Sequence, residues 1–177
     1  MEDSKILDWL AGATFEKLFL QGQATQALSQ PNAEAELTRI VALSDIEPKS
    51  RVLAHELLIQ AGHPVNPELA EVYCQTLPAT FSHNWWGMPG NYIERLGQTV
   101  ISFGKVALPC LSHLLDDKRP LGYFGSEEPT FNQMMQYRVC DLAAYFIAVI
   151  TNISYQDSDN PRVRDEFVQE LRGKLSP

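Results

Sequence analysis

The most hydrophobic stretch of the chain, residues 137–152, reads YRVCDLAAYFIAVITN. Its apolar side chains recur every three or four positions, at Val139, Leu142, Ala143, Phe146, Ile147 and Ile150. Because an α-helix turns once in about 3.6 residues, this spacing places them on one face of a helix. The same period returns in most other segments, and no segment alternates polar and apolar residues as a half-buried strand does. We therefore expect an all-α fold, forming a single α-helical domain over residues 1–177.

Glycine and proline residues mark where these helices begin and end. Gly62 follows the last apolar residue of one helix, the usual place for a C-terminal glycine. Asn66-Pro67 starts the next helix, because asparagine accepts from a free amide and proline at the first position loses no hydrogen bond. Two stretches lack the helical period: a loop from Pro78 to Asn91 and an insertion over residues 118–136.

Two pairs of expected helices share a pattern. The first pair reads LTRIVALSD at 37–45 and RVLAHELL at 51–58, and the second reads LPCLSHLLDD at 108–117 and VCDLAAYFI at 139–147. In each pair the first helix ends in leucine and aspartate, and the second carries a small residue midway, Ala54 or Ala143. This pattern, over about half of the chain, resembles that of HEAT-like helical repeat proteins. The resemblance implies helix pairs stacked into a short solenoid that presents a surface to partners. The insertion at 118–136 departs from it, and an irregular α-helical bundle with two aromatic-rich loops is the alternative.

The charge balance excludes some classes of partner. The 177 residues carry 14 basic and 22 acidic side chains, giving a net charge of −8 and a pI near 4.9. Nucleic acids and anionic membranes are bound through clustered Lys and Arg, so we expect neither as a partner. No apolar run reaches the roughly 18 residues of a membrane helix. The acidic opening Met1–Lys5 lacks the layout of a secretory signal, and three widely spaced cysteines argue against a disulfide framework. We therefore expect a cytoplasmic location.

Motifs for metal or covalent chemistry are incomplete. His55 and the glutamate after it begin like a zinc-protease motif, but Ile59 stands where the second histidine belongs. Cys110 and His113 could share a helix face near Cys140, but zinc needs a fourth ligand and Cys110 lies on an apolar stripe. Serine-hydrolase, P-loop and dinucleotide motifs are missing. We therefore expect no metal, no cofactor and no catalytic residue, and the sequence favours a non-enzymatic protein over an enzyme.

The two irregular segments hold the residues best suited to binding a partner. One contains HNWWGMPG at 83–90, called the Trp loop below, and the insertion contains LGYFGSEEP at 121–129. Loops lie on the surface, and Trp and Tyr supply a large contact area. The expected partner-binding residues are Trp85, Trp86, Met88, Tyr123, Phe124, Glu127 and Glu128. The alternative is that these aromatic side chains cover the core, with one tryptophan inside and one outside as a compromise.

Arg138 and Asp141 lie three residues apart on the most apolar helix. They could form an ion pair in a binding groove or a salt bridge that ties neighbouring helices together. An unpaired arginine beside an apolar face would be costly, so a carboxylate partner is expected either way. We favour the structural ion pair.

Three functions are compatible with these patterns. The first is a non-enzymatic protein-binding module, such as an adaptor, assembly factor or immunity-type protein, that uses its aromatic loops and acidic surface to bind a protein with a partly basic surface. The second is a small-ligand binder or enzyme with a pocket between the Trp loop and the insertion, using His83, Glu127 or Glu128. The third is a structural subunit of a homo-oligomer.

Overall fold

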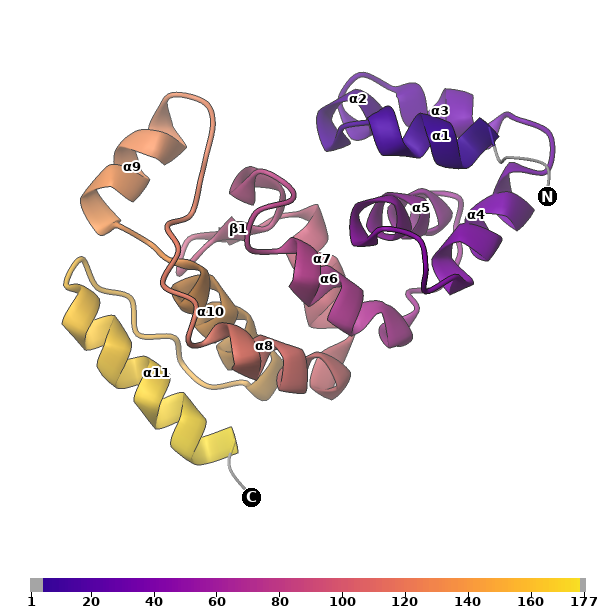
Figure 1. Cartoon of the computed structure of the whole chain (residues 1–177). Helices are drawn as coiled ribbons and strands as arrows, with labels where there is room; N and C mark the ends of the chain where they lie inside the picture. Colours follow the sequence, from indigo (N-terminus) through magenta and orange to yellow (C-terminus); the bar gives the residue numbers. More distant parts are fainter. Residues whose placement is uncertain (1–4, 176–177) are drawn as a thin grey trace. The chain divides into compact units, whose positions relative to one another are not determined.

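The computed structural model describes residues 5–175, and its regular elements are helices apart from one two-stranded hairpin, which confirms the predicted all-α fold (Figure 1). Residues 1–4, on which part of the argument about location rests, lie outside the described range. The chain divides into two compact units, Met1–Val72 and Tyr73–Pro177. The expectation of a single domain over the whole chain, like the HEAT-like resemblance, stays a prediction.

The first unit is made of short helices. They are α1 (Lys5–Gly12), α2 (Phe15–Phe19), α3 (Gln23–Leu28), α4 (Ala33–Ala42), α5 (Pro48–Gln60) and the 3-10 turn η1 (Pro67–Leu69), after which α6 (Ala70–Thr76) begins. The predicted pair of helices is present as α4 packed on α5. The side chain of Asn66 accepts a hydrogen bond from the amide of Glu68 at 3.1 Å, so the predicted restart at Asn66-Pro67 is confirmed, although it opens as a 3-10 turn.

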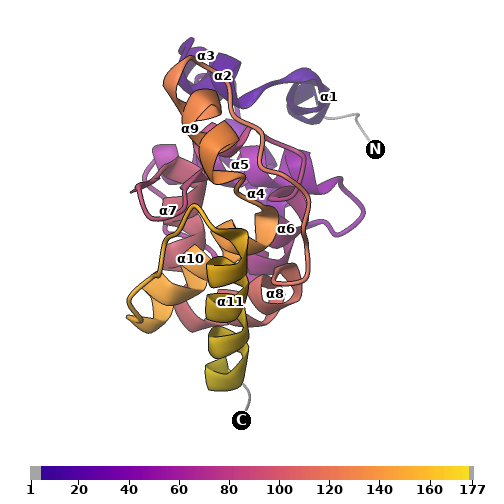
Figure 2. The same ribbon diagram turned by 90° about the vertical axis from the view of Figure 1, so that its left-hand side faces the viewer.

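The second unit is organised around one central helix. Its elements after α6 are the 3-10 turn η2 (His83–Trp85), strands β1 (Gly87–Met88) and β2 (Tyr92–Ile93), α7 (Arg95–Ser102), the 3-10 turn η3 (Gly104–Ala107), α8 (Leu108–Leu114), α9 (Glu127–Met135), α10 (Val139–Thr151) and α11 (Pro161–Leu175). α10 packs against α7, α8 and α11, and α11 runs beside it in both views (Figures 1 and 2). The second predicted pair is thus α8 with α10, and α9 lies within the insertion between them.

A small hairpin begins within the Trp loop, where the sequence predicts no strand. β1 and β2 pair antiparallel, with Gly87 opposite Ile93 and Met88 opposite Tyr92. Gly87 has φ +121°, and a Cβ there would strike the backbone of Tyr92. Gly97 is needed for a different reason, because a Cβ on it would meet the backbone oxygen of Trp86. The two glycines allow the hairpin and α7 to approach this closely.

The structure corrects the prediction about the cysteines. Cys74 on α6 and Cys110 on α8 form a disulfide, with their Cα atoms 6.0 Å apart, while Cys140 is free and buried. An odd count and wide spacing along the chain do not report distance in space, and the packing of the second unit brings these two positions together. Cys110 is buried, as its place on the apolar stripe indicates, but it is bonded to Cys74 and is not a free thiol.

Over residues 5–175, no helix combines the length and the apolar character needed to cross a membrane.

Candidate partner-binding groove

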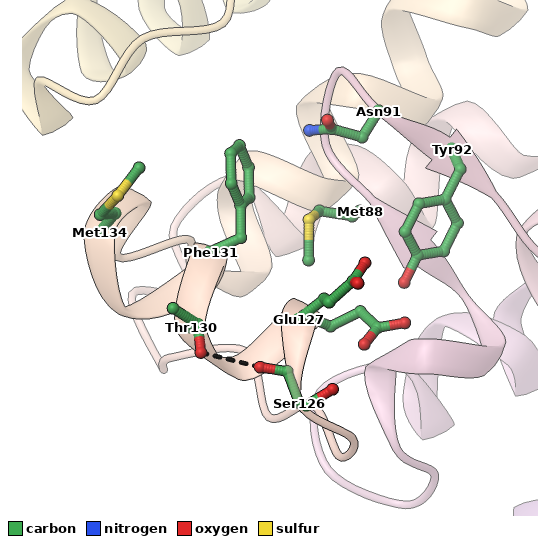
Figure 3. A pocket seen from close by; sticks show the side chains of 9 residues that line it. Met88, Asn91, Tyr92, Ser126, Glu127, Thr130, Phe131 and Met134 are labelled. Atoms are coloured by element: carbon green, nitrogen blue, oxygen red, sulfur yellow. Dashed lines mark hydrogen bonds between the residues drawn. The ribbon is translucent and has the colours of Figure 1, made fainter.

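A groove lies in the second unit between the β1–β2 hairpin and α9 (Figure 3). It has a volume of about 500 Å³. Its lining residues are Met88, Asn91 and Tyr92 from the hairpin, and Ser126, Glu127, Glu128, Thr130, Phe131 and Met134 from α9 and the N-cap residue before it. The two irregular segments singled out from the sequence therefore come together and form its two walls.

The insertion that carries α9 is closed at its base by backbone hydrogen bonds. The amide of Leu121 donates to the carbonyl of Tyr137, and the amide of Val139 donates to the carbonyl of Arg119, both at 2.9 Å. The side-chain amide of Asn132 also donates to the carbonyl of Leu121, at 3.0 Å. The two ends of the insertion are thus joined to each other by hydrogen bonds.

Side-chain hydrogen bonds hold the part of the insertion that precedes α9 against the Trp loop. The side chain of Asn84 makes two hydrogen bonds with the backbone of Phe124: it accepts from the amide at 2.8 Å and donates to the carbonyl at 3.1 Å. The hydroxyl of Tyr123 donates to the carbonyl of Gly87 at 2.9 Å. These bonds fix the position of the segment from which α9 starts, and hence one wall of the groove.

His83 belongs to the same connection and not to the groove. Its Nδ1 accepts from the amide of Gly122 at 2.8 Å, which leaves the proton on Nε2 to be donated to the carbonyl of Leu77 at 3.1 Å. Burial lowers the pKa of His83, so the neutral ring is favoured. Both ring nitrogens are occupied, and His83 therefore holds the Trp loop to the insertion and does not line the pocket in which the second hypothesis placed it.

The groove combines an apolar floor with acidic groups. Met88 is only 3% exposed and forms the floor, whereas Met134 is 67% exposed, and Phe131 lies on the same helix as Met134 (Figure 3). Glu127 and Glu128 occupy the first turn of α9. Within residues 5–175, neither of their carboxylates pairs with a Lys, Arg or His side chain.

Tyr92 faces these carboxylates from the hairpin. Its pKa is raised to about 12, first by burial and then by the negative charges of Glu128 and Glu94. The hydroxyl therefore stays protonated at neutral pH, and it offers one donor and acceptor lone pairs to the groove.

An aromatic pair lies in the connection between the Trp loop and the insertion. The rings of Trp85 and Phe124 are tilted, with centroids 5.8 Å apart. Phe124 is 47% exposed although its backbone is held at both polar atoms by Asn84. An exposed aromatic side chain on a fixed backbone is typical of a binding hot spot, because little backbone entropy is lost when it is covered.

The predicted partner-binding residues are thus divided by the structure. Glu127 and Glu128 line the groove, Met88 forms its floor, and Trp85 with Phe124 forms the aromatic pair. Tyr123 is half-buried and is used for its bond to the hairpin.

The structure contradicts the prediction that Trp86 contacts a partner. It is fully buried and packs edge-on against Tyr73 at 6.3 Å, so it is a core residue and not a partner contact.

Sequence reasoning missed six of the lining positions: Asn91, Tyr92, Ser126, Thr130, Phe131 and Met134. The last two are three residues apart on α9, a spacing that places both on one helix face. That signal was present, but it stood within a segment whose glycines and prolines indicated an irregular loop.

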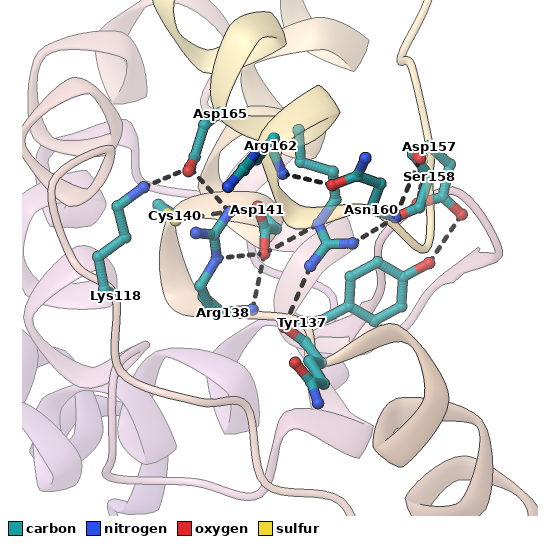
Figure 4. A network of polar contacts seen from close by, with 12 residues as sticks. Lys118, Tyr137, Arg138, Cys140, Asp141, Asp157, Ser158, Asn160, Arg162 and Asp165 are labelled. Atoms are coloured by element: carbon teal, nitrogen blue, oxygen red, sulfur yellow. Dashed lines mark hydrogen bonds and ion pairs between the residues drawn. The ribbon is translucent and has the colours of Figure 1, made fainter.

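Arg138 and Asp141 lie outside the groove, in a polar network (Figure 4). Their side chains are 2.8 Å apart, and Asp141 also accepts from the backbone amide of Arg138, which completes a capping box at the start of α10. Arg164 of α11, 1% exposed, lies 3.3 Å from Asp141, and Arg138 reaches Asp165 of α11 at 3.0 Å. The network thus joins α10 to α11.

His55 in the first unit is a buried, neutral histidine. Its Nε2 accepts from the backbone amide of Asn66 at 3.0 Å, and burial lowers its pKa to about 4. His55 is therefore a structural residue of the first unit, and the incomplete zinc-protease motif that begins with it needs no metal to account for it.

Acidification from pH 7.5 to 4.5 is expected to lower the free energy of unfolding by about 2–3 kcal/mol through His55 alone. The folded pKa of about 4 lies below the ordinary value of 6.5, so the unfolded chain takes up the proton first. The contribution of His55 to the free energy of unfolding is complete above pH 6.5. It decreases as the pH falls from 6.5 to 4, and it changes no further below pH 4. His83 adds a change of the same sign.

Urea unfolding at a series of pH values measures this dependence. His55→Gln should flatten it, while His113→Gln, which changes an exposed histidine, should leave it as it is. An unchanged pH slope in His55→Gln would contradict the assignment.

Among residues 5–175, no group of three or more His, Cys, Asp or Glu side chains could hold a metal ion. No protein family, curated protein or solved structure matches this chain.

Proposed function

We propose that the chain is a non-enzymatic protein-binding module that grips a partner with a partly basic, partly apolar surface through the groove and the Trp85–Phe124 pair. One observation carries the proposal: two carboxylates that have no basic partner among residues 5–175 line a groove together with methionine and aromatic side chains, and the segment before α9 carries an exposed aromatic side chain. An adaptor, an assembly factor or an immunity-type protein would use such a surface.

The parts of this surface have complementary physical roles. The unpaired carboxylates of Glu127 and Glu128 attract a basic segment and select against an acidic one. The flexible thioethers of Met88 and Met134 adapt to the shape of an apolar side chain. Phe124 is already held in place by Asn84, so its contact area is gained at a small entropic cost.

A peptide selection tests the proposal while the partner is still unidentified. Peptides from a random displayed library are selected on the immobilised chain, and the affinity of enriched sequences is measured by fluorescence anisotropy. We expect enriched peptides that combine basic with apolar residues. The Trp85→Ala/Phe124→Ala variant should bind them at least about tenfold more weakly, the scale of one lost hot spot.

The matched control is Val106→Ala. Val106 is also an exposed apolar residue of the second unit, 56% exposed on η3, and it is not part of the groove. Its replacement should leave the affinity unchanged. The proposal fails if no peptide is enriched, or if the double variant and the parent chain bind the enriched peptides equally.

A small-ligand site is the second candidate function, and the volume of the groove favours it, since about 500 Å³ falls within the range of ligand pockets. Native mass spectrometry of the purified chain would detect a bound small molecule. The same spectrum reports the third hypothesis, a homo-oligomer, as a concentration-dependent mass.

The disulfide bears on where the protein acts. Disulfides persist in oxidising compartments and are rare in the cytosol. The predicted cytoplasmic location stays a prediction, and the Cys74–Cys110 bond argues against it.

A further inference from the structure

We propose that the groove receives a lysine side chain of the partner, with the ammonium group held by Glu127, Glu128 and Tyr92 and the alkyl stem lying on Met88 and Phe131. This inference rests on the proposed function, and it names the chemical group that the partner must supply.

The charge of the groove is the first argument. Glu127 and Glu128 are neighbours in the first turn of α9, a position at which the helix dipole favours carboxylates. The two negative charges repel each other, and within residues 5–175 no basic side chain of the chain pairs with either of them. A cation from outside would relieve this repulsion.

The number of acceptors is the second argument. An ammonium group has three N–H donors. We assign these donors to the acceptor oxygens of three of the lining side chains, Glu127, Glu128 and Tyr92, and Figure 3 shows Glu127 lying between α9 and the Tyr92 ring. Because its raised pKa keeps Tyr92 protonated, the hydroxyl adds a dipole and not a third negative charge.

The apolar floor is the third argument, because it distinguishes a lysine from a free metal ion or a bare ammonium ion. Met88 and Phe131 line the groove next to the carboxylates, and the exposed Met134 extends this apolar surface along α9 (Figure 3). A lysine buries its alkyl stem on such a surface while its charged end reaches polar groups.

Three small probes separate these contributions in solution. n-Hexylammonium carries both the stem and the charge, 1-hexanol carries the stem alone, and methylammonium carries the charge alone. Binding is followed by the ¹³C shifts of the methionine methyl groups during titration. We expect n-hexylammonium to shift Met88 and Met134 and to bind at least about tenfold more tightly than either other probe. Met135 is buried and does not line the groove, so its signal should stay in place.

Variants assign the effect to the acidic groups. Glu127→Gln/Glu128→Gln should reduce n-hexylammonium binding to the level of 1-hexanol, and Tyr92→Phe should weaken it by a smaller factor. Asp159→Asn/Glu166→Gln removes the same two charges from exposed positions outside the groove and should leave binding unchanged.

Several results would overturn the inference. Equal binding of 1-hexanol and n-hexylammonium would reduce the site to an apolar groove, and equal binding of methylammonium would reduce it to ion pairing. An equal loss in the Asp159→Asn/Glu166→Gln control would assign the effect to net charge. If the probes fail while the selected peptides still depend on Trp85 and Phe124, the lysine site is wrong and the protein-binding function stands.

Discussion

Asp141→Asn is expected to lower the free energy of unfolding of the second unit by about 3–5 kcal/mol, the range seen when one member of a buried ion pair is removed. The Asp141 side chain has no exposed surface, and it lies between Arg138 at 2.8 Å and the buried Arg164 at 3.3 Å. Asparagine keeps the size of the side chain and part of the capping box. The expected loss therefore comes from an arginine left in the interior without its counter-ion.

The other partners of Arg164 do not replace that charge. Its guanidinium donates to the carbonyl oxygens of Ser158 and Gln136, and it lies 5.2 Å from the centre of the Tyr137 ring. These groups orient the arginine but carry no full negative charge. Tyr137 is itself held by a hydrogen bond from its hydroxyl to Asp157 at 2.7 Å, so a displaced Arg164 would also disturb the connection between α10 and α11.

Urea unfolding followed by circular dichroism measures the cost of Asp141→Asn. Asp165→Asn is the matched control, because Asp165 pairs with Arg138 at 3.0 Å but is 43% exposed, where an ion pair is worth about 1 kcal/mol or less. Replacing both partners, as Asp141→Leu/Arg164→Met, should recover much of the loss, since no charge is then left buried. A cost no larger than that of Asp165→Asn would show that the buried charge is not what holds the two helices.

Most helices of this protein could be predicted from sequence, because the period of buried residues is a local property. One exception is α9, which lies in the insertion where the sequence shows no helical period. The spacing of Phe146 and Ile147 with their neighbours identified α10, and Asn66 identified a helix start through its own hydrogen bond. The ion pair of Arg138 with Asp141 followed from the same local spacing, because the two residues are one helical turn apart.

The features that sequence reasoning missed depend on residues that are distant in the chain. Cys74 and Cys110 are 36 positions apart, and only the folding of the second unit brings them together. His83 was considered as a pocket residue, because the sequence gives no sign of the Leu77 carbonyl and the Gly122 amide that occupy its ring nitrogens. The groove itself needs the insertion to fold back onto the Trp loop, and no local pattern reports that contact.

The burial of Trp86 also depends on residues that are distant in the chain. It leads to the second large expected effect on the free energy of unfolding. Adjacent tryptophans in a turn give no periodic signal, so the sequence could not decide which one lies inside. In the structure Trp85 ends the turn η2, and Trp86 has no exposed surface. The backbone oxygen of Trp86 stands where a Cβ of residue 97 would be, so α7 approaches it closely at Gly97.

Trp86→Ala is expected to lower the free energy of unfolding by about 3–5 kcal/mol, the cost of truncating a large aromatic side chain in a core. Trp85→Ala should cost clearly less, about 1–2 kcal/mol, from its partly buried surface and its pairing with Phe124.

Trp86→Phe separates the effect of side-chain volume from that of the polar indole nitrogen. The indole Nε1 of Trp86 has no hydrogen-bond partner in the described part of the chain, so phenylalanine loses volume but no hydrogen bond and should recover much of the stability. Urea unfolding of the three variants compares these costs directly. Equal losses for Trp85→Ala and Trp86→Ala would contradict the assignment of Trp86 to the core, and would return it to the binding surface that the sequence suggested.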